Sequence, residues 1–219
     1  MVSKNSMKMF IRGLLTSTAI LFFTGMGAAQ SSAQAAATKE YKRLVDLSTA
    51  LRKIPFNKQD KEPHRSFLKR NENDLVYSDP AGEWYVRSAR FWALQKKYQK
   101  LAIADRIAWS AAENPLPGEC EGYVPCYLFA SRRTHGEYLK LYPRGSYSKK
   151  AVQQMIKSLQ YIVDDAASTK KNYDGPVEAA DDAEFAELIK ELREILKPIA
   201  HPEKKIALSQ LKTIEAAYK

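Results

Sequence analysis

The chain of 219 residues is poor in cysteine, histidine and glycine, with two, three and nine of each. Two cysteines cannot supply the four ligands of a structural zinc site, and His135 is the only histidine near them in sequence. The sequence contains no G-x-S-x-G elbow, phosphate-binding glycine loop, HExxH or CxxCH motif. We therefore expect no metal, no cofactor and no enzyme of a common kind.

Long apolar runs are missing beyond the N-terminus. Lys4, Lys8 and Arg12 precede an apolar stretch at 13–26, and an A-x-A pattern follows at 33–35. This order is typical of a secretory signal peptide, and the stretch is short for a membrane span of about 20 residues. We expect residues 1–35 to be removed, so that the mature chain is exported and is not an integral membrane protein. An uncleaved anchor is the alternative.

Export favours a disulfide between the two cysteines. Cys120 and Cys126 form an isolated close pair, which in an oxidising compartment indicates one bond. A redox motif would place two residues between them rather than five. We expect the bond to pin the loop 117–126 ahead of a helix.

Sheet-forming patterns are also scarce, because runs of alternating β-branched residues are missing while alanine, lysine, leucine and glutamate abound. The sequence predicts an all-α fold: a helical domain over 36–175 and an amphipathic helix pair over 176–219. The spacing of apolar residues and the positions of helix-breaking residues predict where the helices begin and end, and Asp79-Pro80 is typical of a helix start. The expected helices cover 38–53, about 79–98, 101–112, about 126–142, a segment from 146 or 148 to about 163, 181–196 and 206–217.

One short segment carries a family resemblance. YLKLYPRGSYSKKA, residues 138–151, resembles the junction between the two helices of a tetratricopeptide-like repeat in periplasmic and outer-membrane assembly and cell-division proteins. The resemblance implies antiparallel helical hairpins stacked in a tetratricopeptide-like or irregular helical bundle. It also favours the periplasm over full secretion. Pro80, Gly82, Trp84 and Ala89 repeat the order of Pro-Gly-Tyr-Ala 63 residues earlier, either as a degenerate repeat or as shared turn chemistry.

Charge is distributed unevenly along the chain. Residues 36–175 carry 25 lysines and arginines against 16 acidic residues, whereas 176–194 carry two against seven. The basic side chains could form a surface for lipid headgroups, wall polymers or an acidic protein. Alternatively, they could be solvated helix faces, with the acidic segment packed as a cap against a basic body, which we favour. Nucleic acid is not an expected partner, because export removes the encounter and no binding motif is present. The basic candidates in this stretch are Arg132, Arg133, Lys140, Arg144, Lys149, Lys150 and Lys157.

These observations predict an exported binding or scaffold protein of the cell envelope that recognises a protein or peptide. The expected binding groove is aromatic and basic, with the residues Arg132, Arg133, Tyr138, Tyr142 and Tyr147.

Two alternatives remain open. A wall-acting enzyme would set Glu119, Glu121 or Glu137 against a second carboxylate or His135. A secreted effector or inhibitor would insert the loop 118–126 into a target, with Tyr123 and Val124 exposed at its tip.

Overall fold

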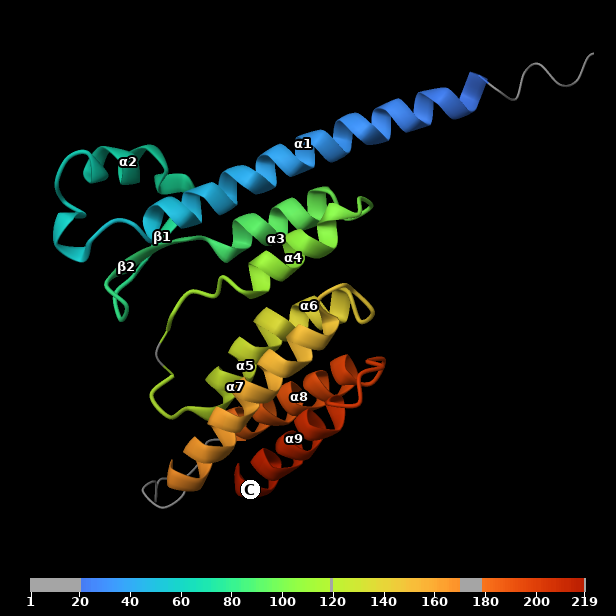
Figure 1. Ribbon diagram of the computed structural model, residues 1–219. Coiled ribbons are helices and arrows are strands. Elements are labelled where there is room, and N and C mark those ends of the chain that lie inside the picture. Colours follow the sequence, from blue (N-terminus) through green and yellow to red (C-terminus); the bar gives the residue numbers. More distant parts are fainter. Residues whose placement is uncertain (1–20, 119, 170–178, 219) are drawn as a thin grey trace, which may run out of the picture.

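The computed structural model describes residues 21–118, 120–169 and 179–218, and the chain there is mostly helical (Figure 1). In the N-terminal half, helices flank one small sheet: α1 (Leu21–Leu51), η1 (Phe56–Lys58), α2 (His64–Arg70), η2 (Glu72–Asp74), β1 (Leu75–Ser78), β2 (Glu83–Val86), α3 (Ser88–Lys97) and α4 (Ile103–Ala112). The C-terminal half is helical in its described residues: α5 (Val124–Ser131), η3 (Arg132–Gly136), α6 (Glu137–Leu141), α7 (Ser148–Thr169), α8 (Ala179–Leu196) and α9 (Lys204–Tyr218).

The helix predicted over about 79–98 is present only from Ser88 to Lys97, as α3, and its first part is wrong, because residues 75–86 form an antiparallel β-hairpin. Leu75 pairs with Val86 and Ser78 with Glu83, and Gly82 turns the chain with a φ of 63°. β-branched and aromatic side chains favour strands, and Tyr77 packs against Trp84 across the pair with ring centroids 5.2 Å apart. The turn around Pro80 therefore joins strands, whereas the turn around Pro143 joins helices. The two segments are not copies of one repeat unit.

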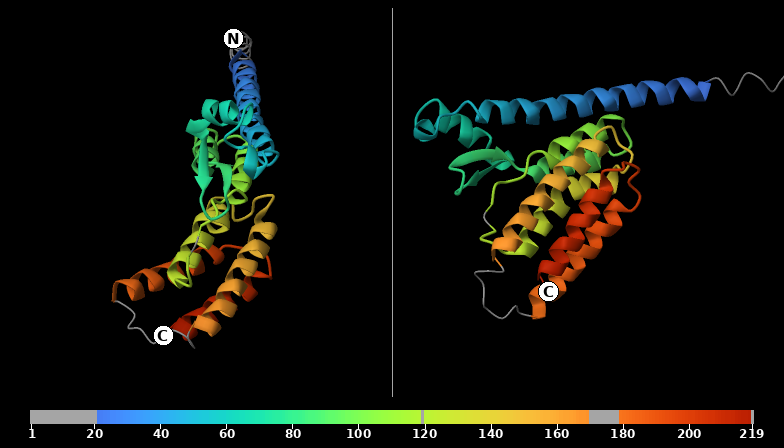
Figure 2. Two further views of the ribbon diagram at one scale, coloured as in Figure 1. Left: turned by 90° about the vertical axis from the view of Figure 1, so that its left-hand side faces the viewer. Right: turned by 60° about the horizontal axis from the view of Figure 1, so that its bottom comes forward.

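Two hydrophobic cores share α4. The N-terminal core joins side chains of α1 to α4, and the C-terminal core joins those of α4 to α9. On α4, Ile107 and Ala111 belong to the first core, and Ala108 and Ala112 belong to the second. Trp92 of α3 is half-buried against both cores. The α4 helix therefore lies between the two halves and contacts both (Figures 1 and 2).

The first helix, α1, is long and begins inside the expected signal peptide, whose residues 1–20 lie outside the described part. Its N-terminal end extends past the other helices (Figure 2). Among the side chains described from Ser31 onward, the first buried one is Ala37, followed by Leu44, Leu47 and Leu51. The contacts of α1 with the core thus begin just after the expected cleavage point.

A nearly continuous helix, α5 to α6, contains one turn of π-helix. The predicted disulfide is present. It joins Cys120, which precedes α5, to Cys126, which lies within α5, and their Cα atoms are 5.6 Å apart. The π turn, η3, ends at Gly136, where an added Cβ would lie 3.0 Å from the Ser131 carbonyl oxygen. Because Gly136 has no side chain, the helix continues into α6 without a close contact between residue 136 and the Ser131 carbonyl oxygen.

The predicted helical hairpin is present and turns between α6 and α7. Val152, Met155 and Leu159 of α7 are fully buried, as their spacing predicts. At the turn, Gly145 lies directly against α6: an added Cβ would be 2.5 Å from the Tyr138 hydroxyl and 2.7 Å from Tyr142 Cβ. The turn therefore requires glycine because the backbone approaches these side chains so closely.

The C-terminal helices close the core of the second half. The apolar face predicted for α8 is buried, with Phe185, Leu188, Ile189, Leu192, Ile195 and Leu196 in the C-terminal core. In α9, Leu211 and Ile214 are buried, whereas Ile206 is exposed. The division of the chain at 175 or 176 falls within residues 170–178, which lie outside the described part.

Gly145→Ala tests the close approach at the α6–α7 turn. We expect a loss of about 1–3 kcal/mol in the free energy of unfolding, because the added methyl overlaps packed atoms. Gly118→Ala is the matched control, since an added Cβ there meets nothing within 4 Å. Denaturant unfolding of both variants measures the difference, and equal stabilities would contradict the packing described.

Candidate functional site

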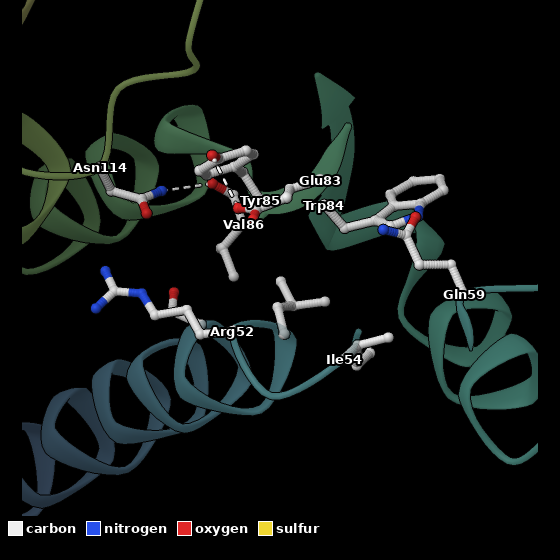
Figure 3. Close-up of a pocket in the computed structure, with 10 residues that line it drawn as sticks. Arg52, Ile54, Gln59, Glu83, Trp84, Tyr85, Val86 and Asn114 are labelled. Atoms are coloured by element: carbon white, nitrogen blue, oxygen red, sulfur yellow. Dashed lines mark hydrogen bonds between the residues drawn. The ribbon is translucent and has the colours of Figure 1, made fainter. Parts of the chain in front are cut away.

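A cleft of about 250 Å³ lies between the C-terminal end of α1 and strand β2 (Figure 3). Its apolar wall consists of Leu51, Ile54 and Val86, with Val86 pointing from β2 toward α1. A volume of this size corresponds to on the order of eight water molecules. The cleft can therefore enclose a side chain or a small group rather than a large cofactor.

Polar groups surround this apolar wall. Arg52 lies toward one end of the cleft, away from Trp84 and Gln59 (Figure 3). The Arg52 side chain is exposed and makes no ion pair in the described part of the chain. The Ser48 hydroxyl oxygen, which also lines the cleft, is buried without a hydrogen-bond partner among these residues. A buried polar group without a partner is costly, so a bound acceptor or donor at Ser48 would be favoured.

Two amides hold the cleft in shape. The Gln59 amide donates to the Gly82 carbonyl at 2.9 Å, which ties the loop after η1 to the hairpin. The Asn114 amide donates to the Val86 carbonyl at 2.5 Å, which ties the end of β2 to the segment after α4. Burial, together with the Glu83 carboxylate that accepts from its hydroxyl, raises the pKa of Tyr85. Tyr85 therefore stays protonated and can donate a hydrogen bond.

The tyrosines predicted to line a groove instead stabilise the α6–α7 turn. Tyr138 is fully buried, and its hydroxyl donates to the Asp105 carboxylate at 2.5 Å and accepts from the Tyr147 amide at 3.0 Å. Burial and the Asp105 carboxylate raise the pKa of Tyr138. Tyr147 stacks on Trp109 with centroids 5.1 Å apart, and the Tyr142 hydroxyl accepts from the Gln95 amide at 2.8 Å. Tyr138, Tyr142 and Tyr147 do come together, as an internal cluster.

The two predicted arginines have different surroundings. Arg132 is half-buried and pairs with Glu191 of α8 at 2.8 Å, so it joins two helices. Arg133 is exposed and lies over the Phe129 ring, 5.3 Å from its centroid. Of the five residues predicted to bind a partner, only Arg133 is fully exposed.

The disulfide loop packs on α8 instead of protruding. Val124 is buried, whereas Tyr123 is 37% exposed, as expected for the loop tip. The Tyr123 hydroxyl shares its proton between Asp181 at 2.8 Å and Glu184 at 3.1 Å. Glu121 is exposed with a φ of 47°, and Glu119 lies outside the described residues. This placement argues against insertion of the loop into a target.

His135 faces a carboxylate that the sequence did not suggest. Its Nε2 atom lies 2.8 Å from Glu113 at the end of α4, and its ring packs on Trp109 at 5.8 Å. Burial lowers the pKa of His135, although the Glu113 carboxylate opposes this effect. Neither residue lines the α1–β2 cleft, and the carboxylate that His135 contacts is Glu113 rather than Glu121 or Glu137. The pair resembles a structural contact more than a catalytic one.

No comparison identified a relative: family models, curated proteins and solved structures all gave no match. The tetratricopeptide-like kinship therefore stays a prediction. Over the described ranges, no helix has the length and apolarity needed to cross a membrane. In that same part of the chain, no group of three or more histidine, cysteine, aspartate or glutamate side chains could hold a metal ion.

Sequence reasoning missed the α1–β2 cleft. Its lining comes from separate stretches, from Ser48 on α1 to Asn114 after α4, which only the fold brings together. A signal was present in the hairpin, because aromatic and β-branched residues on both sides of Asp-Pro-Ala-Gly favour two strands.

Tyr138→Phe tests the structural role of the tyrosine cluster. Removal of the hydroxyl leaves the Asp105 carboxylate and the Tyr147 amide without their bonds. We expect the free energy of unfolding to fall by about 1–3 kcal/mol. Denaturant unfolding checks this, and an unchanged midpoint would leave the tyrosine free for another role.

The pH dependence of stability tests the surroundings of His135. Its folded pKa lies below the unfolded value of about 6.5, so the unfolded state binds the proton more tightly. This contribution to stability is present above pH of about 6.5 and is lost as the pH falls through the folded pKa. His135→Gln should lose less melting temperature than the wild type on acidification.

His64→Gln is the control for this experiment, because His64 lies on α2, away from Glu113 and Trp109. Thermal melting at neutral and mildly acidic pH compares the three proteins. If acidification lowers the melting temperature of the wild type and of the His135 variant equally, the His135 imidazole does not contribute to the pH dependence of stability.

Proposed function

We propose that the chain is an exported helical binding protein of the cell envelope that holds a protein or peptide partner through the α1–β2 cleft. The observation that carries the proposal is the combination of an apolar wall with the Ser48 hydroxyl and the Arg52 guanidinium, neither of which has a partner among the residues that the structure describes. An apolar pocket with a few polar groups is the usual form of a binding site. A peptide has groups that suit both parts of the cleft. One of its apolar side chains would pack on the apolar wall, and its backbone carbonyl or carboxylate oxygens would accept hydrogen bonds from Ser48 and Arg52.

The export part of the proposal rests on two features of the chain. The N-terminus has the charge, apolar core and small-residue pattern of a signal peptide. The disulfide between Cys120 and Cys126 would persist in an oxidising compartment such as the periplasm. The kinship with tetratricopeptide-like scaffolds belongs to the same proposal and is supported by the α6–α7 hairpin alone.

A binding role explains the described geometry better than a wall-acting enzyme does. Acid–base catalysis needs a proton-transferring group within reach of a bound substrate. His135 and Glu113 bond to each other and lie outside the cleft lining, while Arg52 and Ser48 lie within it. Arg52 and Ser48 offer hydrogen-bond donors to a ligand, and the Glu83 carboxylate, which also lines the cleft, accepts from the Tyr85 hydroxyl.

Selection of peptides from a displayed random library tests the cleft. The purified oxidised chain from Ala36 should select peptides with an apolar residue next to an acidic one. Arg52→Ala should then weaken their binding at least about tenfold, because a hydrogen bond to a charged group is worth about 1.5–3 kcal/mol. Ser48→Leu, which fills the cleft, should abolish binding.

Arg106→Ala is the matched control, since Arg106 of α4 is exposed and makes no ion pair among the described residues. Thermal melting first establishes that all variants are folded. Selected peptides that bind the Arg52, Ser48 and Arg106 variants equally would place the binding site elsewhere, and a library without enrichment would argue against peptide recognition.

A further inference from the structure

The end of the molecule formed by residues 53–70 projects away from the helices of the second half. It comprises η1, α2 and their connections, and it lies beyond the C-terminal end of α1 (Figures 1 and 2). We call this segment the basic tip. In the described part of the chain, Leu68 is its only fully buried residue, so most of its side chains face solvent.

Charge in the basic tip is strongly one-sided. The segment contains six lysines and arginines against two acidic residues. Arg65 pairs with Glu62 at 3.1 Å, and the other five cations make no ion pair with any described residue. These five side chains are all exposed: Lys53, Lys58, Lys61, Lys69 and Arg70.

In the stretch where the sequence suggested an anion-binding surface, Arg132 and Lys149 pair with Glu191 and Glu203. Five other cations of that stretch are also exposed and make no ion pair among the described residues: Arg133, Lys140, Arg144, Lys150 and Lys157. The basic tip differs from them by the greater exposure of an aromatic side chain among its cations.

An exposed aromatic side chain stands among these cations. Phe56 of η1 is 70% exposed, more than any other large apolar side chain described. Its ring lies over Gly82 of the hairpin turn, where an added Cβ would be 2.9 Å from the ring. The hairpin thus supports one part of the ring and leaves the rest in solvent. Burial of the exposed part of the ring against an apolar surface would be favourable.

A shallow groove in the basic tip also combines apolar side chains with exposed cations. It has a volume of about 260 Å³ between α1 and α2, with Ile54, Pro63 and Phe67 among its apolar lining. Lys53 and Arg70 line it as well. An apolar surface bordered by unpaired cations suits a molecule that has an anionic head and an apolar body.

We infer that the basic tip docks on the surface of an anionic lipid bilayer, with Phe56 inserted at the headgroup level and the cations against the headgroups. Clusters of four to eight lysines and arginines bind anionic membranes, and aromatic side chains add binding by burial at the interface. A purely charged polymer would use the cations and leave Phe56 without a role. Ile54 and Gln59 belong both to the basic tip and to the lining of the peptide cleft. The two proposals are tested separately, because Phe56, Lys58 and Lys61 do not line that cleft.

Vesicle co-sedimentation tests the inference with the chain from Ala36. We expect binding to vesicles of equal parts phosphatidylglycerol and phosphatidylcholine, little binding to phosphatidylcholine alone, and weaker binding as salt rises. Each cation near an anionic surface contributes about fivefold, so Lys58→Gln with Lys61→Gln should weaken binding about 25-fold. Phe56→Ala should weaken it several-fold, and this loss should persist at high salt because the ring acts by burial.

Lys96→Gln with Lys100→Gln is the matched control, because both lysines are exposed, make no ion pair in the described chain and lie near the far end of α3. Thermal melting establishes that every variant is folded. An equal loss in the control would show attraction by net charge alone and would overturn the inference. So would binding without dependence on Phe56, or no binding to the anionic vesicles.

Discussion

Packing on both sides of one short helix holds the molecule together. The α4 helix presents Ile107 and Ala111 to the N-terminal core and Ala108 and Ala112 to the C-terminal core. Alanine side chains let neighbouring helices approach closely, and interiors packed at crystal-like density do not absorb added volume. Without α4, each half would expose one face of its core. The position of the cleft relative to the helices of the second half is therefore fixed through this helix.

The two halves use their polar and aromatic residues differently. In the second half several of these groups pair between elements: Arg132 with Glu191, Arg193 with Glu215, and Tyr123 with Asp181 and Glu184. Exposed cations such as Arg133 and Lys140 remain without an ion pair in the described part of that half. At the far end of the first half, Ser48, Arg52 and the cations of the basic tip have no such partners among the described residues. Internal pairing favours a rigid support, whereas unpaired groups favour contact with other molecules. Both proposals accordingly concern the same end of the chain.

Helical periodicity predicted much of the fold, and it failed where another pattern competed with it. The burial of α7 and α8 follows from apolar spacing alone, since Val152, Leu159 and Leu192 are all fully buried. Asp79-Pro80 is a good start for a helix as well as for a turn, so the sequence predicts a helix where the structure has a β-hairpin. Aromatic residues in a motif do not reveal whether they are buried, so the sequence does not distinguish a groove residue from the buried Tyr138. The cleft joins distant stretches and could not be read from local sequence.

The π turn between α5 and α6 changes which way the second part of that helix faces. One extra residue in a helix rotates everything after it by about 100°. Leu128 before the turn and Tyr138 after it are both buried in the C-terminal core, and the Tyr138 hydroxyl reaches Asp105 on α4. In a regular helix, residues ten positions apart would lie about 80° from each other, whereas one extra residue places them on roughly opposite sides of the helix axis. A helix without the π turn would therefore direct Tyr138 away from Asp105. The exact number of residues in this segment is therefore a constraint as strict as their identity, and a single deletion would cost more here than most substitutions.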